Sequence, residues 1–262
     1  MILTHQNYHT LENRYLTNSR IGDWLKCKRF FFERHISGQR PGMVITDALK
    51  IGKAVDIFIS QGEEEFRKQF IAVSRRNIKN PPINVIELTE KQYEDVIGMS
   101  QVILNQPAYK DLADYDKQRI ITLDMPIGEH FCGLAGIPDF MRIEGDTCYL
   151  VDEKTAWDTD DRKYYYKCRD FGYFRQFAVM TIILRQTNPE IKNFIYRHLV
   201  IEKDKDSIFQ PAVFTLANEQ IEAEIDVINK HIIPDISKEK DFKPKEVNWK
   251  DAILIGAMDE EI

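Results

Sequence analysis

The sequence has few cysteines, and none of them are paired in a metal-binding spacing. Its four cysteines, Cys27, Cys132, Cys148 and Cys168, lie far apart, and no two are separated by only two residues. This scatter excludes a zinc knuckle and gives no sign of a disulfide framework. We therefore expect four reduced, mostly buried thiols.

Long apolar runs and phosphate-binding loops are also missing. No window comes near the roughly 18 uninterrupted apolar residues that a membrane span requires, and the first residues show no basic stretch followed by an apolar one. No Gly-x-x-x-x-Gly-Lys-Ser/Thr motif occurs, which excludes an ATP-driven helicase in this chain. We expect a cytoplasmic protein with no membrane partner.

An excess of positive charge is likewise absent. The 36 Lys and Arg residues face 42 Asp and Glu residues, so the formal net charge is −6. This balance argues against binding nucleic acid through a generally basic surface. Basic residues nevertheless recur in three local groups, which are Lys26, Lys28, Arg29, Arg34 and Arg40; Arg67, Lys68, Arg75, Arg76 and Lys79; and Arg162, Lys163, Lys167 and Arg169. A basic groove beside an acidic pocket agrees with the total charge, although a solvated helix face explains each group at least as well.

The apolar residues that are present follow helical and then strand periods. Their spacing predicts helices over residues 18–36, 47–60 with a further turn or two over 63–70, 89–103, 173–186 and 216–233, the last ended by Pro234. Runs rich in β-branched and aromatic residues predict strands over 120–127, 131–143, 147–154, 193–202 and 209–214. The first three of these strands indicate an antiparallel meander.

This order of elements predicts an α/β or α+β fold with one mixed sheet and a helical N-terminal elaboration. No internal repeat, low-complexity tract or linker occurs. We therefore expect one domain over residues 1–262, with a mainly helical part over 1–115, a sheet core over 116–215 and a C-terminal helix and tail over 216–262.

Two carboxylates and a lysine meet across the predicted hairpin. On a strand alternate side chains share a face, so Asp152 and Lys154 project together while Glu153 points away. Asp139 lies on the preceding strand, where Pro138 favours a bulge that can re-aim a side chain. Hard oxygen ligands in this arrangement suit Mg²⁺ or Mn²⁺. The lysine can orient or deprotonate a water, so the set fits phosphodiester hydrolysis.

A purely structural explanation fits these three residues equally well, with Asp152 and Lys154 as an ion pair and Asp139 capping a turn. Two further residues extend the catalytic hypothesis. Asp56, four residues after Gly52 on a predicted helix, would supply another oxygen to the metal, and a glycine there suggests close backbone approach. Gln176 offers a donor and an acceptor to a phosphate or a base edge. Taken singly, each also fits an ordinary helix-surface residue.

Other aromatic and histidine residues leave alternatives open. Tyr164, Tyr165 and Tyr166, flanked by Lys163 and Lys167, could stack on bases. They could equally form a loop whose tyrosines pack on the core. The histidines, His198 among them, form no ligand spacing.

Taken in order, these motifs resemble those of RecB-like PD-(D/E)xK exonucleases, nearest to the RecE-type (exonuclease VIII-like) members of phages and prophages. The resemblance covers roughly residues 15–200 and rests on the ordered series. The matching segments are Thr17 to Ser19, Trp24 to Phe30, Gly52 with Asp56, Gly136 to Asp139, Val151 to Thr155, and Gln176.

The resemblance implies a restriction-endonuclease-like αβββαβ core with a mixed central sheet, and hydrolysis of DNA ends with one or two Mg²⁺ or Mn²⁺ ions. By position, Asp139 and Asp152 would bind metal together with the backbone carbonyl of Glu153. Lys154 would be the catalytic lysine and Gln176 would contact substrate. DNA is the implied partner, with a single-strand annealing protein as a second one and a DNA-enclosing homo-oligomer as a further hypothesis.

The sequence departs from the family pattern at three points. Asp56 stands where many members have histidine, which keeps an oxygen ligand but alters metal preference. Met180 stands where a tyrosine often follows the glutamine, so that hydroxyl is lost. Cys27 matches the first ligand of the iron–sulfur cluster that some relatives bind, but no cysteine follows Cys168, so we predict no cluster.

Three functions agree with these residues and motifs. The leading one is an exonuclease acting on DNA ends in recombination or phage replication. The second is a structure-specific or restriction-like endonuclease on the same fold. The third is an inactive nuclease-fold module that binds DNA or a protein.

Overall fold

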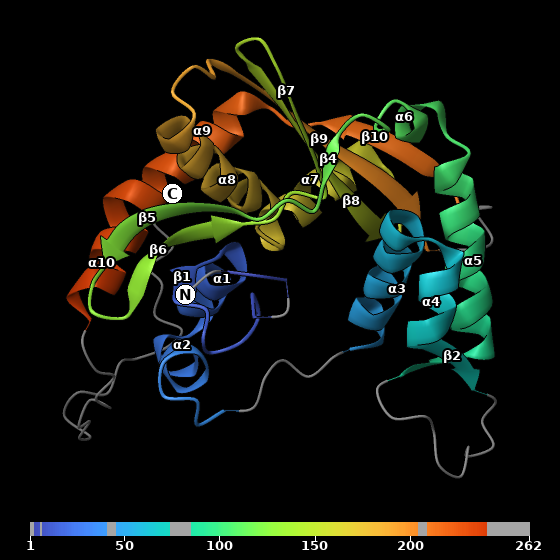
Figure 1. Cartoon of the computed structure of the whole chain (residues 1–262), viewed down its shortest axis with the longest axis horizontal. Coiled ribbons are helices and arrows are strands. Elements are labelled where there is room, and N and C mark those ends of the chain that lie inside the picture. Colours follow the sequence, from blue (N-terminus) through green and yellow to red (C-terminus); the bar gives the residue numbers. More distant parts are fainter. Residues whose placement is uncertain (1–2, 6, 41–45, 74–84, 204–208, 240–262) are drawn as a thin grey trace, which may run out of the picture.

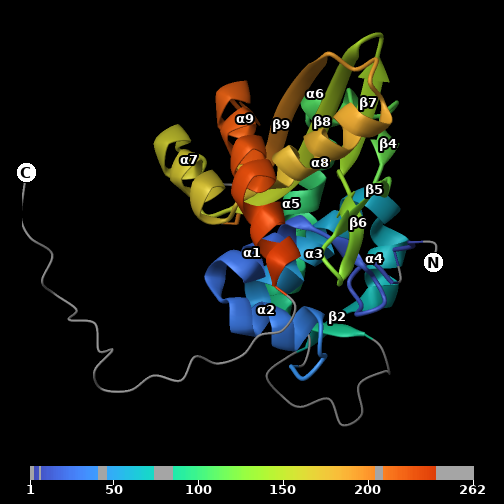
Figure 2. The same ribbon diagram turned by 90° about the vertical axis from the view of Figure 1, so that its left-hand side faces the viewer.

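The computed structural model of the chain describes residues 3–5, 7–40, 46–73, 85–203 and 209–239. Part of the second basic group, namely Arg75, Arg76 and Lys79, lies outside the described residues, as does the tail from residue 240 onward. Figures 1 and 2 show the arrangement of the helices and strands in two views a quarter turn apart.

The N-terminal third is mainly helical, as predicted, but it is divided into more helices than expected. They are α1 (Asn18–Lys26), α2 (Lys28–His35), α3 (Asp47–Gln61), α4 (Glu63–Gln69), α5 (Glu90–Leu104) and α6 (Pro107–Lys110). The single helix expected over residues 18–36 is wrong, because Cys27 adopts an extended conformation between α1 and α2. The break lets Phe31 pack edge-on against Trp24, with 5.3 Å between ring centroids.

Local signals in the sequence fix the ends of the next helices. Gly62 has a φ of 94°, a left-handed conformation that favours glycine, and it separates α3 from α4. Residues 63–70 therefore do not continue α3. Thr89 and Gln92 form a reciprocal capping box that starts α5 at the predicted position.

The central sheet has five strands in the order β10-β9-β8-β7-β4. These are β4 (Asp116–Lys117), β7 (Phe140–Glu144), β8 (Thr147–Ala156), β9 (Asn193–Glu202) and β10 (Pro211–Thr215). β8 pairs in parallel with β9 and antiparallel with β7, so the sheet is mixed, as predicted. The strand that carries Asp152 and Lys154 thus has a neighbour on each side.

The expectation of one sheet is wrong, because a second sheet has the order β1-β6-β5 and a pair of short parallel strands forms a third. Their strands are β1 (Tyr15–Leu16), β5 (Ile121–Ile127), β6 (Phe131–Gly136), β2 (Phe70–Val73) and β3 (Ile86–Thr89). The strand expected over residues 131–143 is wrong, because β6 and β7 belong to different sheets. Pro138 lies in the break and has no N–H to donate to a ladder. The predicted meander is therefore divided beside Asp139.

The C-terminal half of the described chain adds helices α7 (Asp161–Asp170), α8 (Tyr173–Thr187), α9 (Asn218–Val227) and α10 (Ile233–Lys238). A π-helical turn, Ile228–Ile232, joins α9 to α10. Pro234 does not end the helical run as expected, because it lies at the start of α10, directly after this wider turn. α7 replaces the loop considered for residues 164–166.

Two hydrophobic clusters lie on opposite faces of the central sheet. One gathers α8, α9 and the second sheet; the other gathers α3, α4 and α5. In Figure 1 the first group lies to the left of the central strands and the second to the right. Successive residues of β8 serve opposite clusters, with Leu150 in the first and Val151 in the second. Among the described helices, none combines the length and apolar character needed to span a membrane.

Candidate active site

Asp139 lies at the junction of the two larger sheets. The sequence placed it on a strand, but it occupies the bend between β6 and β7. Its Oδ2 accepts a hydrogen bond from the backbone N–H of Glu153 at 2.7 Å, and its carbonyl accepts one from the N–H of Gln118 at 2.9 Å. The side chain thereby bridges to β8 just beyond the last β7–β8 pair, Phe140 with Val151.

Asp152 and Lys154 project from the same face of β8, as alternation predicts. Asp152 is 1% exposed, and its Oδ1 accepts a hydrogen bond from Gln176 Nε2 at 2.6 Å. Its Oδ2 forms an ion pair with the Lys154 ammonium. Lys154 also lies over the ring of Tyr173, 4.9 Å from the centroid. Helix α8 thus holds both charged groups from one side.

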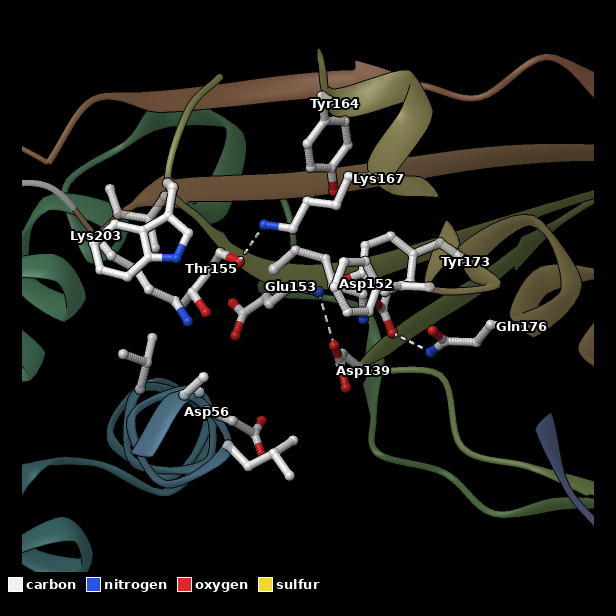
Figure 3. A pocket seen from close by; sticks show the side chains of 18 of the residues that line it. Asp56, Asp139, Asp152, Glu153, Thr155, Tyr164, Lys167, Tyr173, Gln176 and Lys203 are labelled. Atoms are coloured by element: carbon white, nitrogen blue, oxygen red, sulfur yellow. Dashed lines mark hydrogen bonds and ion pairs between the residues drawn. The ribbon is translucent and has the colours of Figure 1, made fainter. Parts of the chain in front are cut away.

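Asp56 and Glu153 form the opposite wall. Asp56 comes from α3, and its Oδ1 accepts a hydrogen bond from Gln118 Nε2 at 2.8 Å. The Glu153 carbonyl stays a predicted metal ligand, and the Glu153 carboxyl group also lies close enough to Asp139 and Asp56 for their charges to act on it. Figure 3 shows Asp56 rising from its helix towards Glu153 and Asp139. Glu153 Oε1 is buried without a hydrogen-bond partner among the described residues.

The acidic groups disturb one another's titration. Burial, reinforced by the charge of Asp139, raises the pKa of Asp56 to about 7. Burial, with the charges of Asp139 and Asp56, raises the pKa of Glu153 well above its usual range. Burial raises the pKa of Asp139, although Lys154 and the Glu153 N–H offset part of this rise. Burial lowers the pKa of the Lys154 ammonium. The site holds more buried negative charge than this one ammonium balances.

These residues fit a hard divalent cation. The carboxyl groups of Asp56, Asp139, Asp152 and Glu153 line the cavity around Lys154, and the buried Oε1 of Glu153 accepts no hydrogen bond from the described residues. Oxygen ligands of this kind, completed by water, are those that Mg²⁺ and Mn²⁺ prefer. In the described part of the chain, no three His, Cys, Asp or Glu side chains are already gathered into a complete ligand group. A bound ion would therefore draw these carboxylates together or take waters as further ligands.

Several smaller predictions can be compared with the structure. The Gln176 amide donates a hydrogen bond to Asp152, while its contact with substrate stays a prediction. A Cβ added to Gly52 would lie 3.8 Å from Thr155 Oγ1, an ordinary contact, so close approach does not explain this glycine. Met180 is buried in the core. Of the four unpaired cysteines, only Cys148 and Cys168 are buried, so the expectation of mostly buried thiols is half right.

His198 is a neighbour of the site that the sequence did not reveal. It lies on β9 in register with Asp152 and is fully buried. Its Nδ1 shares a hydrogen bond with the Tyr164 hydroxyl at 2.9 Å, while Nε2 has no hydrogen-bond partner among the described residues. Burial, together with the charge of Lys154, lowers the pKa of His198 well below its usual range. The imidazole is therefore neutral. Only the parallel β8–β9 pairing would have identified this position.

The cavity above these residues has a volume of about 1010 Å³. Its floor is formed by β8 with Asp139, and its walls by α3, by α7 with the start of α8, and by the residue that follows β9. A second, smaller cavity of about 400 Å³ shares Asp56, Asp139 and Gln176 with the first. The candidate catalytic groups thus line a cavity that is large enough for a sizeable ligand.

Comparison with known proteins identifies the family to which the chain belongs. The profile of a family described as "PDDEXK-like domain of unknown function (DUF3799)" matches residues 18–247. The chain belongs to this family. The match spans both hydrophobic clusters and all the candidate site residues, so the resemblance to the PD-(D/E)xK superfamily is confirmed.

One solved structure confirms the fold of this PDDEXK-like domain. A crystal structure from Eubacterium rectale, described as a "putative exonuclease", shares 18% identity and has a TM-score of 0.67. The similarity covers 90% of this chain and 87% of that one. The structure of SSO0001 shares 10% identity and has a TM-score of 0.28, and the similarity covers 53% of this chain and 59% of that one. This structure is too distant to support an argument. No curated protein matches the sequence.

Proposed function

We propose that this PDDEXK-like protein is a Mg²⁺- or Mn²⁺-dependent nuclease that hydrolyses phosphodiester bonds at DNA ends. The observation that carries the proposal is the convergence of Asp139, Asp152 and Lys154 on the floor of an open cavity, joined through the Glu153 N–H. Acidic oxygens beside one ammonium suit a substrate whose phosphate carries negative charge and whose hydrolysis needs an activated water.

In this proposal Asp139 and Asp152 hold the metal, with Asp56 and the Glu153 carbonyl as further ligands. A bound ion would supply Lewis-acid polarisation of the phosphate and a water of lowered pKa. Gln176 fixes one oxygen of Asp152, which leaves the other towards Lys154. The Glu153 N–H holds Asp139 in place.

Lys154 is the group that acts on the reacting water or on the charge that develops at phosphorus. Burial lowers the pKa of its ammonium, so the group releases and regains a proton more readily than an exposed lysine does. Asp152 and the Tyr173 ring hold the ammonium in one position. Such positioned proton transfer commonly contributes about 10²- to 10⁴-fold to a rate.

The test is incubation of the pure protein with linear and with circular duplex DNA in Mg²⁺ or Mn²⁺. We expect linear DNA to be shortened from its ends and the circle to survive. Lys154→Met and Asp152→Asn should lower the rate by at least about 100-fold. Lys192→Ala, an exposed lysine just before β9, should leave the rate unchanged.

The other outcomes select the alternative functions. Cutting of the circle would identify an endonuclease. A chain that binds DNA with wild-type affinity in both site variants, and hydrolyses neither substrate, would be a binding module. The role in phage-type recombination, with an annealing protein as partner, is part of the proposal and is supported by the resemblance of the ordered motifs to RecE-type exonucleases.

A further inference from the structure

One wall of the cavity exposes aromatic side chains to solvent. Trp157 is 74% exposed, Phe171 64% and Tyr166 42%, and all three line the cavity that contains Lys154. Tyr164 also lines the cavity, but it is only 2% exposed and shares a hydrogen bond with His198, so its ring is not free for a ligand to stack on. Large aromatic surfaces left in water beside an active site commonly mark a binding surface.

Two lysines lie beside these rings. Lys203 directly follows β9, and its N–H donates to the carbonyl of Ala156 at 2.7 Å, so it lies next to Trp157 at the end of β8. Lys167 reaches across from α7, and its ammonium donates to the Thr155 carbonyl at 3.4 Å. Figure 3 shows both side chains on the same wall of the cavity, with Thr155 between them.

The two ammonium groups lack acidic partners within the described residues, where neither forms an ion pair. Asp158 and Asp170 line the same cavity but already pair with Lys163 and Arg169. Burial, and then the charge of Lys167, lowers the pKa of Lys203. Two partly buried cations held side by side are stabilised by an anion between them.

We infer that this wall binds an unpaired stretch of polynucleotide next to the bond that is cut, with Lys167 and Lys203 on its phosphates and Trp157 and Tyr166 on its bases. The inference rests on the proposed nuclease function and names its substrate class. Base faces are open to aromatic rings only when the bases are unpaired, since in a duplex they are stacked on one another. The substrate is therefore a single strand or a duplex with a single-stranded end.

Binding can be measured without cleavage. A labelled single strand, a blunt duplex and a duplex with a single-stranded overhang are titrated by fluorescence anisotropy in Ca²⁺, with the integrity of each checked on a gel. We expect the single strand and the overhang to bind more tightly than the blunt duplex. Trp157→Ala should weaken binding of the first two about tenfold and leave the third unchanged.

Trp157→Phe provides a matched control, because the ring remains but its fluorescence is lost. Single-stranded DNA should quench tryptophan emission in the wild type and much less in Trp157→Phe, which should bind with nearly unchanged affinity. Trp24 is buried in the core, so Trp157 is the described tryptophan that a ligand can reach.

The lysines are tested by salt dependence. Each phosphate contact on a single strand contributes about 0.7 to the slope of log affinity against log salt. Lys167→Ala combined with Lys203→Ala should therefore reduce the slope by about 1.4. Lys192→Ala, at the opposite end of β9, should leave it unchanged. These substitutions are at four exposed or partly buried positions, and thermal denaturation would show that the fold is kept.

Wild-type affinity and quenching in Trp157→Ala, or equal losses for single-stranded and blunt DNA, would overturn the inference. These outcomes are separable from failure of the proposed function. A protein that shows this binding pattern but never hydrolyses DNA would refute the nuclease proposal alone. A protein that hydrolyses DNA with no dependence on Trp157 would refute the single-strand site alone.

Discussion

Asp56 is a carboxyl group that opposes folding when it is ionised. Its pKa rises from an ordinary 3.8 to about 7 in the folded protein. When the pKa of a group is higher in the folded state than in the unfolded state, its full contribution to the free energy of unfolding is present below the unfolded-state pKa. That contribution is lost as the pH rises through the folded-state pKa. In the metal-free protein this contribution is therefore lost between about pH 4 and pH 7.

Asp56→Asn should prevent this loss of stability at higher pH. The amide keeps an acceptor for Gln118, so the variant should equal the wild type near pH 4 and exceed it by about 1–3 kcal/mol above pH 7. Urea denaturation in EDTA at several pH values measures the difference. Asp47→Asn, an exposed position at the start of the same helix, is the control, and a difference that does not change with pH would contradict this role of Asp56.

Gln176 has two possible roles, and its contact with Asp152 favours one of them. If it positions Asp152, Gln176→Ala should raise the Mn²⁺ concentration needed for half-maximal activity by about 10- to 100-fold, as loss of a ligand's supporting hydrogen bond commonly does. If it contacts substrate instead, the KM for DNA should rise at an unchanged metal requirement. Activity measured over a grid of Mn²⁺ and DNA concentrations separates the two.

At the scale of elements, the pairing of β5 with β6 depends on a glycine. A Cβ at Gly133 would lie 1.8 Å from the carbonyl oxygen of Leu123 and 2.9 Å from the Met125 nitrogen, both backbone atoms of the neighbouring strand. The register of the pair shifts between Asp124 and Ile127, so the strands approach closely at a bulge.

Gly133→Ala should therefore destabilise the protein by at least about 3 kcal/mol, because the strands would have to separate. Gly145→Ala is the control. Unlike Gly133, Gly145 has a positive φ, of 57°, and it has open space around it, so the substitution should cost only about 1 kcal/mol. Equal losses in denaturation experiments would contradict a special requirement for close strand contact at Gly133.

The elements that the sequence predicted well carry strong local signals. α5 begins at its capping box, and β8, α8 and β9 appear within a residue or two of their expected bounds. The misjudged elements depend on distant contacts. Cys27 interrupts an apolar helical pattern only because Phe31 folds back on Trp24. The run 131–143 reads as one strand because periodicity cannot show that its halves pair in different sheets.

The residues of the candidate site likewise fall into those that local sequence patterns predict and those that depend on distant contacts. Asp139, Asp152 and Lys154 could be brought together from the sequence, since alternation on a strand and a hairpin place them near one another. The side chain of Glu153 and the ring of His198 could not. Their positions depend on how α3 approaches β8 and on the parallel pairing of β8 with β9, which no local pattern records.

At the scale of the whole molecule, the acidic site lies where the two hydrophobic clusters meet. Asp56 belongs to the helix that packs in one cluster, and Asp152 faces the helix that packs in the other. The hydrophobic cluster around α3, α4 and α5 also joins the predicted helical part, residues 1–115, to the predicted sheet core, residues 116–215. Met99 and Leu199, for example, both belong to it. We therefore propose that residues 1–262 act as one folding unit, joined further by any ion bound at the site.

Mn²⁺ should accordingly raise the melting temperature of the whole protein. Saturation at about 100 times the dissociation constant stabilises by about 2.7 kcal/mol, or about 5–10 °C for a chain of this size. The shift should be larger at pH 8 than at pH 5.5, because protons compete for the raised-pKa carboxyls. Asp152→Asn should abolish most of it in the same scanning assay. An equal shift in that variant would place the ion elsewhere.

The bond from the Glu153 N–H to Asp139 has a consequence for the history of this family. Because that carboxylate takes the place of a ladder partner at the point where two sheets separate, selection for a stable fold alone would preserve an acceptor there. Descendants that lost activity would be expected to keep Asp139 for this reason. Lys154 balances the charge of the buried Asp152, so these two residues would be expected to disappear together, because removing one partner of a buried ion pair leaves the other charge uncompensated.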